Sequence, residues 1–202
     1  GCALEVLRVS DGAVSAVGQL GDTVCVLFAT DPRHKGGALG VDGCAAIVEA
    51  YETATQRGTP VIGIWQSGGA RLPEGAASLD AVGSVFAAMT RASGVIPQIS
   101  VVLGPAAGGA AYGPALTDVV IVGPAARVFV TGPDIVNSVT GETVDAESLG
   151  GPHVHAKSSG LSHIRTASDG EALTRAREVA SLLSNTHTGL GDKAVSSDPG
   201  RF

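Results

Sequence analysis

Two runs of strand length, the all-apolar residues 60–65 and the β-type residues 99–103, are each followed by a turn made of glycine and other small residues. A segment of helical periodicity follows the first turn, and small residues that can continue as a helix follow the second. All-apolar runs are typical of strands buried on both faces, and strand–turn–helix alternation is typical of parallel sheets with right-handed crossovers. The sequence therefore predicts an α/β fold with a mostly parallel sheet flanked by helices.

The rest of the pattern predicts the elements of a single domain. Three strands joined by tight turns are expected first, at residues 4–9, 13–20 and 23–29. Amphipathic helices are expected at 43–57 with Asp42 as N-cap, at 75–92 with Leu79 in its buried stripe, and at 169–183 with Leu173 facing the core. Shorter strands are expected at 119–122 and 128–130, a short helix at 131–138, and a loop at 148–162. We expect the domain to cover residues 1–185 and residues 186–202 to form a tail or a linker.

The two small-residue turns are Ser67-Gly-Gly-Ala-Arg71 and Gly104-Pro-Ala-Ala-Gly-Gly109. Both lie at the carboxyl ends of neighbouring predicted strands, which is where α/β folds bind ligands. Gly108 and Gly109 have no Cβ to keep a ligand away, and N–H groups at the start of a helix are unpaired and carry partial positive charge. The pattern predicts a site for an oxyanion, such as the oxygen of a thioester enolate. The alternative is that these two glycines only form a tight turn that needs positive φ angles.

Composition argues against several other classes of function. The net charge of −6 and an aromatic content of 3% argue against nucleic acid as a main partner. The apolar runs are too short to cross a bilayer, and no signal peptide is evident at the N-terminus. Cys2, Cys25 and Cys44 form no close pair, so neither a zinc site nor a disulfide framework is expected. These features predict a cytoplasmic protein.

Charged residues near the turns allow two interpretations each. Arg71 can bind a phosphate of a cofactor, or it can pair with Glu74 across its own turn. The basic run 33–35 precedes the turn at Gly36 and Gly37, where it can meet phosphates or remain a solvated loop.

Other reactive side chains give weaker signals. Ser67 follows a strand, as a nucleophile would, but Trp65 occupies the first glycine position of the Gly-x-Ser-x-Gly pattern. His153, His155 and His163 can supply a base or metal ligands, yet no cysteine or carboxylate lies at ligand spacing. We therefore expect ordinary surface or core histidines and no metal site.

Five segments occur in one continuous order along the chain. They are Ser67-Gly-Gly-Ala-Arg-Leu-Pro-Glu-Gly75, Ala92-Ser-Gly-Val-Ile-Pro-Gln-Ile-Ser100, Gly104-Pro-Ala-Ala-Gly-Gly-Ala-Ala-Tyr112, Val130-Thr-Gly-Pro-Asp134 and Thr140-Gly-Glu-Thr143. As a set they closely resemble the carboxyltransferase (β) subunit of biotin-dependent acyl-CoA carboxylases, of the acetyl-CoA and propionyl-CoA carboxylase type. The resemblance is strong from about Gly36 to Asn185, and it is to the N-terminal domain of that subunit.

This resemblance implies a crotonase-like spiral of ββα units and a role in fatty acid and lipid metabolism. It implies transfer of a carboxyl group from carboxybiotin to the α-carbon of an acyl-CoA, with released biotin as the base. Biotin would be carried by a partner carrier protein or biotin carboxylase subunit, and a second carboxyltransferase domain would complete the site in a homo-oligomer. The family's backbone oxyanion donors fall on Gly108 and Gly109, with a further donor in the turn of Gly68, Gly69 and Ala70. Contacts to the CoA cofactor are expected from Arg71, Gly36, Gly37 and Tyr112, although Tyr112 can also be a packing residue.

Two other hypotheses remain open at this point. One is a biotin-independent crotonase-like hydratase or decarboxylase of CoA esters, which would need an aspartate or glutamate at the site. The other is a non-catalytic assembly half of a carboxylase, whose role is to pack against a partner.

Overall fold

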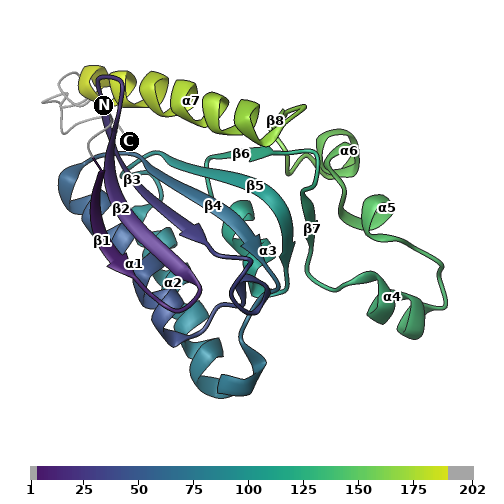
Figure 1. The fold of residues 1–202 in the computed structure, drawn as a ribbon. Helices are drawn as coiled ribbons and strands as arrows, with labels where there is room; N and C mark the ends of the chain where they lie inside the picture. The colour runs from purple at the N-terminus through teal and green to yellow at the C-terminus, as the bar shows by residue number, and fades with distance from the viewer. Residues whose placement is uncertain (1–3, 191–202) are drawn as a thin grey trace, which may run out of the picture.

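The protein is built around a single twisted sheet, seen in the computed structural model, which describes residues 4–190 (Figure 1). Strands β1 (Leu4–Val9), β2 (Ala13–Leu20) and β3 (Thr23–Thr30) form an antiparallel meander. From β3 onward the neighbours run parallel, in the order β4 (Val61–Ser67), β5 (Gln98–Ala107), β6 (Val119–Val122) and β8 (Ile164–Arg165). The predicted α/β class and its mostly parallel sheet are confirmed.

Strand β5 changes partner along its length. Its first half, residues 99–102, pairs with β6, whereas residues 105–107 pair with β7 (Arg127–Phe129). It is therefore longer than the predicted run of 99–103, and β7 lies off the path of the main sheet beside its far end. This exchange of neighbours brings β7 beside the second glycine turn.

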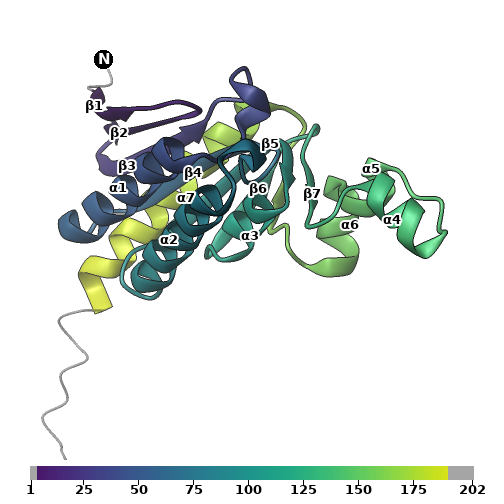
Figure 2. The ribbon, with the colours of Figure 1, turned by 90° about the horizontal axis from the view of Figure 1, so that it is seen from below.

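Helices cover both faces of the sheet (Figure 2). On one face lie α1 (Val41–Arg57), α2 (Ala76–Ala92) and α3 (Gly109–Ala115), and on the other lies α7 (Asp169–Leu190). Between β7 and β8 the chain forms α4 (Pro133–Thr140), α5 (Ala146–Gly150) and α6 (Pro152–Val154), followed by a π-helical turn at His155–Ser159. These elements project from the body of the sheet in both views.

Two hydrophobic cores result, one on each face. The core under α1 and α2 is centred on Phe28 and Trp65, whose rings meet edge to face at 5.1 Å, and Trp65 Nε1 donates to Ser100 Oγ at 3.0 Å. The core under α7 joins the sheet to three alanines of the helix, Ala172, Ala176 and Ala180. Small side chains let α7 approach the sheet closely, which explains how a domain with few aromatic residues packs.

Four details of the sequence prediction are wrong. Leu79 and Leu173 are 62% and 41% exposed, because the buried stripes of their helices run through other residues. Asp42 does not cap α1, whose N-cap position is Gly40. The expected loop 148–162 is largely helical, and α7 continues to Leu190 rather than ending at 183. Cys2 and residues 191–202 of the expected tail lie outside the described residues.

In the described part of the chain no helix combines the length and apolarity that crossing a membrane requires.

Candidate active site

The two small-residue turns lie against each other at the carboxyl edge of the parallel strands. Strands β4 and β5 are paired, with Ser67 opposite Ala106. Gly69 has a φ of +98°, and a Cβ there would lie only 2.7 Å from the Ala107 carbonyl oxygen. The predicted meeting of the two turns is therefore confirmed, and glycine at position 69 makes the approach possible.

The Gly36–Gly37 turn joins them as a third layer. The Gly68 amide donates to the Gly36 carbonyl at 3.1 Å. A Cβ on Gly37 would overlap the Gln66 carbonyl, so this turn also needs glycine for close backbone approach. Residues 36–37, 67–70 and 107–109 thus form one block of stacked backbone.

Hydrogen bonding distinguishes the five predicted amide donors. Three already have acceptors: Gly68 donates to Gly36 O, Gly69 to Ser67 Oγ at 3.2 Å, and Gly108 to Phe129 O at 3.2 Å. Within the described residues, the Ala70 and Gly109 amides donate to no backbone or side-chain acceptor. The structure thus places one free N–H on each turn, and the predicted pair Gly108 and Gly109 is reduced to Gly109.

Arg71 is turned away from this edge and into the protein. Its side chain is only 5% exposed, and Nη1 donates to Asp11 Oδ2 at 2.7 Å and to Glu74 Oε1 at 3.0 Å. Nη2 donates to two carbonyls, Asp11 O at 3.0 Å and Ala38 O at 3.1 Å. Of the two interpretations of Arg71, the structure shows the ion pair with Glu74.

The carboxylates of this cluster are held ionised. Partial desolvation opposes ionisation of Asp11, but the hydrogen bond and charge of Arg71, aided by His34 and Lys35, lower its pKa overall. The pKa of Glu74 is lowered overall: the hydrogen bond from the Val41 amide is the largest cause, partial desolvation opposes it, and the hydrogen bond and charge of Arg71 lower the pKa further. Both groups therefore stay charged around neutral pH.

The basic run before Gly36 is largely neutralised by neighbours. Arg33 forms a bidentate pair with Asp31 and holds the pKa of that carboxyl down at about 2, mainly through its hydrogen bonds. The His34 imidazole contacts Asp11, and Lys35 Nζ lies 3.7 Å from the same carboxylate. Little free positive charge is left here for a phosphate.

The other reactive side chains have structural partners. Ser67 is 1% exposed and its Oγ accepts from the Gly69 amide, so it does not face the site as a nucleophile would. His155 Nε2 contacts Val128 O at 2.7 Å, and His163 Nδ1 accepts from the Val120 amide at 2.9 Å. Among the described residues, no group of three or more His, Cys, Asp or Glu side chains is placed to hold a metal.

The position of Tyr112 fits both of its expected roles, as a ligand contact and as a packing residue. It is 47% exposed at the start of α3 and packs its ring 5.8 Å from that of Phe86. The ring thus packs on Phe86 and also remains half-exposed.

Two supporting contacts were not foreseen from the sequence. Glu74 Oε2 accepts from the Val41 amide at 2.8 Å and so serves as the N-terminal cap of α1 from 33 positions away. The Phe129 carbonyl, at the end of β7, accepts from Gly108 and orients the second turn. Both are long-range partners that local sequence patterns do not signal.

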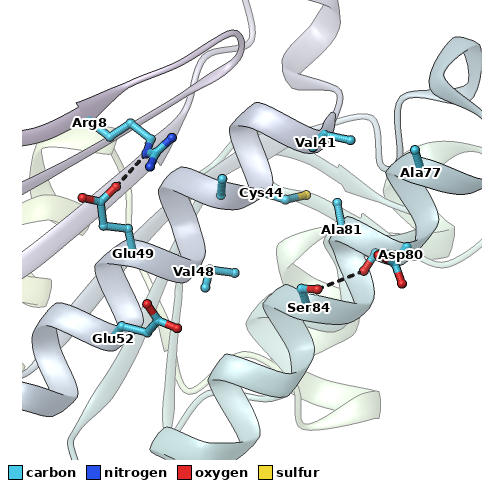
Figure 3. Close-up of a pocket in the computed structure, with 11 residues that line it drawn as sticks. Arg8, Val41, Cys44, Val48, Glu49, Glu52, Ala77, Asp80, Ala81 and Ser84 are labelled. Carbon is cyan, nitrogen blue, oxygen red and sulfur yellow. Dashed lines mark hydrogen bonds and ion pairs between the residues drawn. The ribbon is translucent and has the colours of Figure 1, made fainter.

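A groove of about 620 Å³ runs between α1 and α2, away from the stacked turns (Figure 3). Arg8 at its rim pairs with Glu49 at 2.6 Å, and Cys44 in its floor is 1% exposed, with burial raising the pKa of the thiol to about 11. Its lining is Arg8, Val41, Cys44, Ala45, Val48, Glu49, Glu52, Ala77, Asp80, Ala81 and Ser84. None of the predicted site residues lines it, so its chemistry is separate from that of the turns.

Comparisons with known proteins agree with this architecture. The chain is 56% identical over 176 residues to the propionyl-CoA carboxylase beta chain of Rhodococcus erythropolis, covering 87% of this chain and 37% of that protein. It is 56% identical over 182 residues to the biotin-dependent acetyl-/propionyl-coenzyme A carboxylase beta6 subunit of Mycobacterium tuberculosis, covering 89% and 38%. The structure superposes on transcarboxylase 12S, solved as a hexamer with methylmalonyl-coenzyme A bound, with a TM-score of 0.82 and 40% identity over 84% of this chain and 33% of that one.

The chain therefore spans a little over a third of the length of these relatives. The likeness to transcarboxylase 12S confirms the expected crotonase-like arrangement. The sequence model of the protein family described as 'Carboxyl transferase domain' matches residues 2–199 of this chain. Because the match covers nearly the whole chain, this protein belongs to the carboxyl transferase domain family.

Proposed function

We propose that this chain forms the acyl-CoA-binding half of a biotin-dependent carboxyltransferase that acts on propionyl-CoA or acetyl-CoA. The observation that carries the proposal is the pair of free amides, Ala70 on the first turn and Gly109 on the second. The turns are in contact at Gly69 and Ala107, and we propose that one oxygen atom accepts from both donors. We assign the thioester carbonyl to this position.

Such a pair stabilises the enolate that forms when the α-proton of an acyl-CoA leaves. Each well-placed backbone donor contributes roughly 3–4 kcal/mol to a developing oxyanion in a site shielded from water. Amide donors are fixed by the fold, so they need no reorganisation during the reaction. The remaining glycines of the block act by holding these two in place.

The proton acceptor must come from outside the two turns. Arg71 is the only ionisable residue within 67–71 and 104–109, and its guanidinium is buried against Asp11 and Glu74. This donor set, rich in amides and without a base, fits a reaction in which carboxybiotin brings both the carboxyl group and, once released, the nitrogen that takes the proton. A hydratase or decarboxylase that supplies its own carboxylate fits the same turns less well.

The CoA portion approaches over the outer layer of the block. Gly36 is exposed, has a φ of +66° and has open space beside it, so its backbone is available to a ligand. Tyr112 is half-exposed and lies three residues after Gly109, and we propose that it lines the acyl chain. We do not extend this role to Arg71, because its four terminal N–H groups already have acceptors.

A second carboxyltransferase domain completes the proposed site. Helix α4 has no buried residue, and Val130, Ile135 and Val139 are 55%, 56% and 77% exposed on and beside it. Apolar side chains gathered on a projecting element are typical of a surface that another protein covers. The hexameric assembly of transcarboxylase 12S supports a homo-oligomer. We further propose that biotin is carried by a partner carrier protein, in keeping with the biotin-dependent name of the Mycobacterium tuberculosis relative.

Gly109 offers a sharp test, because it occupies the first helical position of α3. Proline is well tolerated at that position and has no N–H, so Gly109→Pro removes the donor at little cost to the helix. Gly109→Ala is the matched control, since it adds a Cβ near Val82 in the same way and keeps the N–H. Titration calorimetry with propionyl-CoA and with S-propyl-CoA, which lacks the carbonyl oxygen, measures the contribution of that oxygen.

We expect the native protein and Gly109→Ala to prefer the thioester over the thioether, and Gly109→Pro to lose that preference. Equal binding of both ligands by the native protein would contradict the oxyanion assignment. No binding of either ligand would overturn the proposed function.

A further inference from the structure

Arg71 follows Ala70 directly, and the hydrogen bonds around it fix the position of the 38–40 segment beside Ala70. The Arg71 amide donates to Leu39 O at 2.9 Å, and the Leu39 amide donates to Gly69 O at 2.8 Å. These two bonds bracket Ala70 in a single parallel bridge to Leu39. The direction of the free Ala70 N–H is therefore set by the position of the 38–40 segment.

The Arg71 side chain holds that same segment from the other side. Nη2 donates to Ala38 O, and its second bond, to Asp11 O, ties the turn between β1 and β2 to the cluster. Nη1 reaches Asp11 Oδ2 and Glu74 Oε1, so all four terminal N–H groups are used. One residue thus joins three chain segments, those around Asp11, Ala38 and Glu74.

The surroundings are shaped to a planar guanidinium. A Cβ at Gly40 would lie 2.8 Å from Nη1, and one at Gly12 would lie 3.0 Å from Nη2. Glycine at both positions leaves room for the flat group between two backbone turns. A lysine ammonium carries its donors at one point and cannot reach four acceptors spread over a fork.

We infer that Arg71 is a positioning residue of the oxyanion site: its guanidinium fixes the 38–40 segment and thereby the direction of the Ala70 amide. The inference rests on the proposed function, because it needs the Ala70 amide to meet the thioester oxygen. Arg71 contacts neither substrate nor reacting atoms. Its effect on the reaction is exerted through Ala70 alone.

Comparing the binding of two ligands distinguishes a positioning role of Arg71 from an ordinary structural role. A general loss of structure would weaken propionyl-CoA and S-propyl-CoA together, whereas a misdirected Ala70 amide weakens only the ligand with a carbonyl oxygen. A displacement of about 1 Å in a reacting geometry can cost ~100-fold, so we expect a loss of about 10-fold or more for the thioester in Arg71→Lys. Binding of the thioether should change by no more than about 2-fold, since the fold survives.

Titration calorimetry of the native protein, Arg71→Lys and Arg175→Lys provides the test. Arg175 also pairs with a glutamate three residues away, Glu178 at 2.8 Å, but on α7 far along the chain from the turns, which makes it the matched control. Glu74→Gln is a milder variant of the same cluster and should give a smaller loss with the same ligand preference. It replaces Arg71→Lys in the comparison if the lysine variant does not fold.

The outcomes are distinguishable. Selective loss of thioester binding in Arg71→Lys or Glu74→Gln, with Arg175→Lys unchanged, supports the inference. Unchanged or equally weakened binding of both ligands overturns it while leaving the proposed function intact. Equal binding of both ligands by the native protein contradicts the oxyanion assignment, and with it this inference. No binding of either ligand by the native protein overturns the proposed function.

Discussion

The two turns of the site are alike in sequence, but different kinds of interaction hold them in place. The first, Ser67–Ala70, is stabilised by a cluster of charges centred on Arg71. Among the residues that the structure describes, the second turn, Ala107–Gly109, has no charged contact of its own. It is held by β7, whose Phe129 carbonyl accepts from Gly108, and behind β7 by His155. One half of the site therefore depends on pH and ionic strength, and the other on packing and neutral hydrogen bonds. Four predictions test that contrast, from the largest expected effect to the smallest.

The contact between the turns is where a substitution should do most damage. Gly69→Ala places a Cβ 2.7 Å from Ala107 O in a residue with a φ of +98°, so both turns must move. We expect a loss of about 3 kcal/mol in the free energy of unfolding and loss of propionyl-CoA binding. Denaturant unfolding and calorimetry measure the two effects.

Gly21→Ala is the control for this substitution. Gly21 also has a positive φ, +66°, but nothing lies within 4 Å of its Cβ position. It should lose only about 1 kcal/mol and bind normally. Equal losses at the two positions would show that backbone conformation, and not the contact between the turns, determines the cost.

Acid should loosen the first turn before the second. Folding lowers the pKa of Asp11 and Glu74 below their ordinary values of 3.8 and 4.5. Their ionised forms therefore stabilise the protein fully above those values, and this contribution is lost as the pH falls through the lowered pKa values. In an NMR titration from pH 7 to 3 we expect the Ala70 amide signal to shift in this acid range while that of Gly109 stays constant. A shift of both signals together would contradict the separation of the two halves.

Removing His155 should weaken the second turn. Its Nε2 donates to Val128 O, next to the residue that accepts from Gly108, and imidazole carries that proton in its charged form too. His155→Ala should cost about 1–2 kcal/mol of stability and reduce propionyl-CoA binding. His163→Ala removes a comparable bond to Val120 on β6 and should cost as much stability without affecting binding. Comparable weakening of binding in both variants would argue against β7 as the support of Gly108.

Ser67→Ala should have the smallest effect. It removes an acceptor of the Gly69 amide at 3.2 Å, a neutral bond worth about 1 kcal/mol. Carboxyl transfer should continue within a few-fold of the native rate, because Ser67 takes no covalent part. Complete loss of activity with normal folding would restore the nucleophile interpretation.

The sequence predicted the parts of this molecule that are encoded locally. Apolar runs located β4, β5 and β6, and the two glycine turns were correctly expected at one edge of the sheet. Gly58 was visible as the end of α1, where it adopts the left-handed conformation.

What the sequence did not predict depends on distant partners. Which amides are free was decided by Phe129 and by Gly36, neither of which is near in sequence to the residue it satisfies. Leu173 was misplaced because α7 packs on the sheet through Ala172, Ala176 and Ala180, a choice set by how closely the sheet lets the helix approach. The π-helical turn at 155–159 was missed because its anchor, Val128 O, lies in another strand.

The cap that Glu74 provides to α1 has a consequence for the order of folding. Helices in proteins gain most of their stability from tertiary contacts, and here the group that satisfies the first turn of α1 is made only after β4 and the turn that follows. We therefore expect that the β1–β3 meander and α1 do not fold as a unit before β4 and the turn after it have formed. During synthesis, the N-terminal third of the domain should wait for residue 74 to emerge, so that the helix and the first turn of the site become structured in the same step.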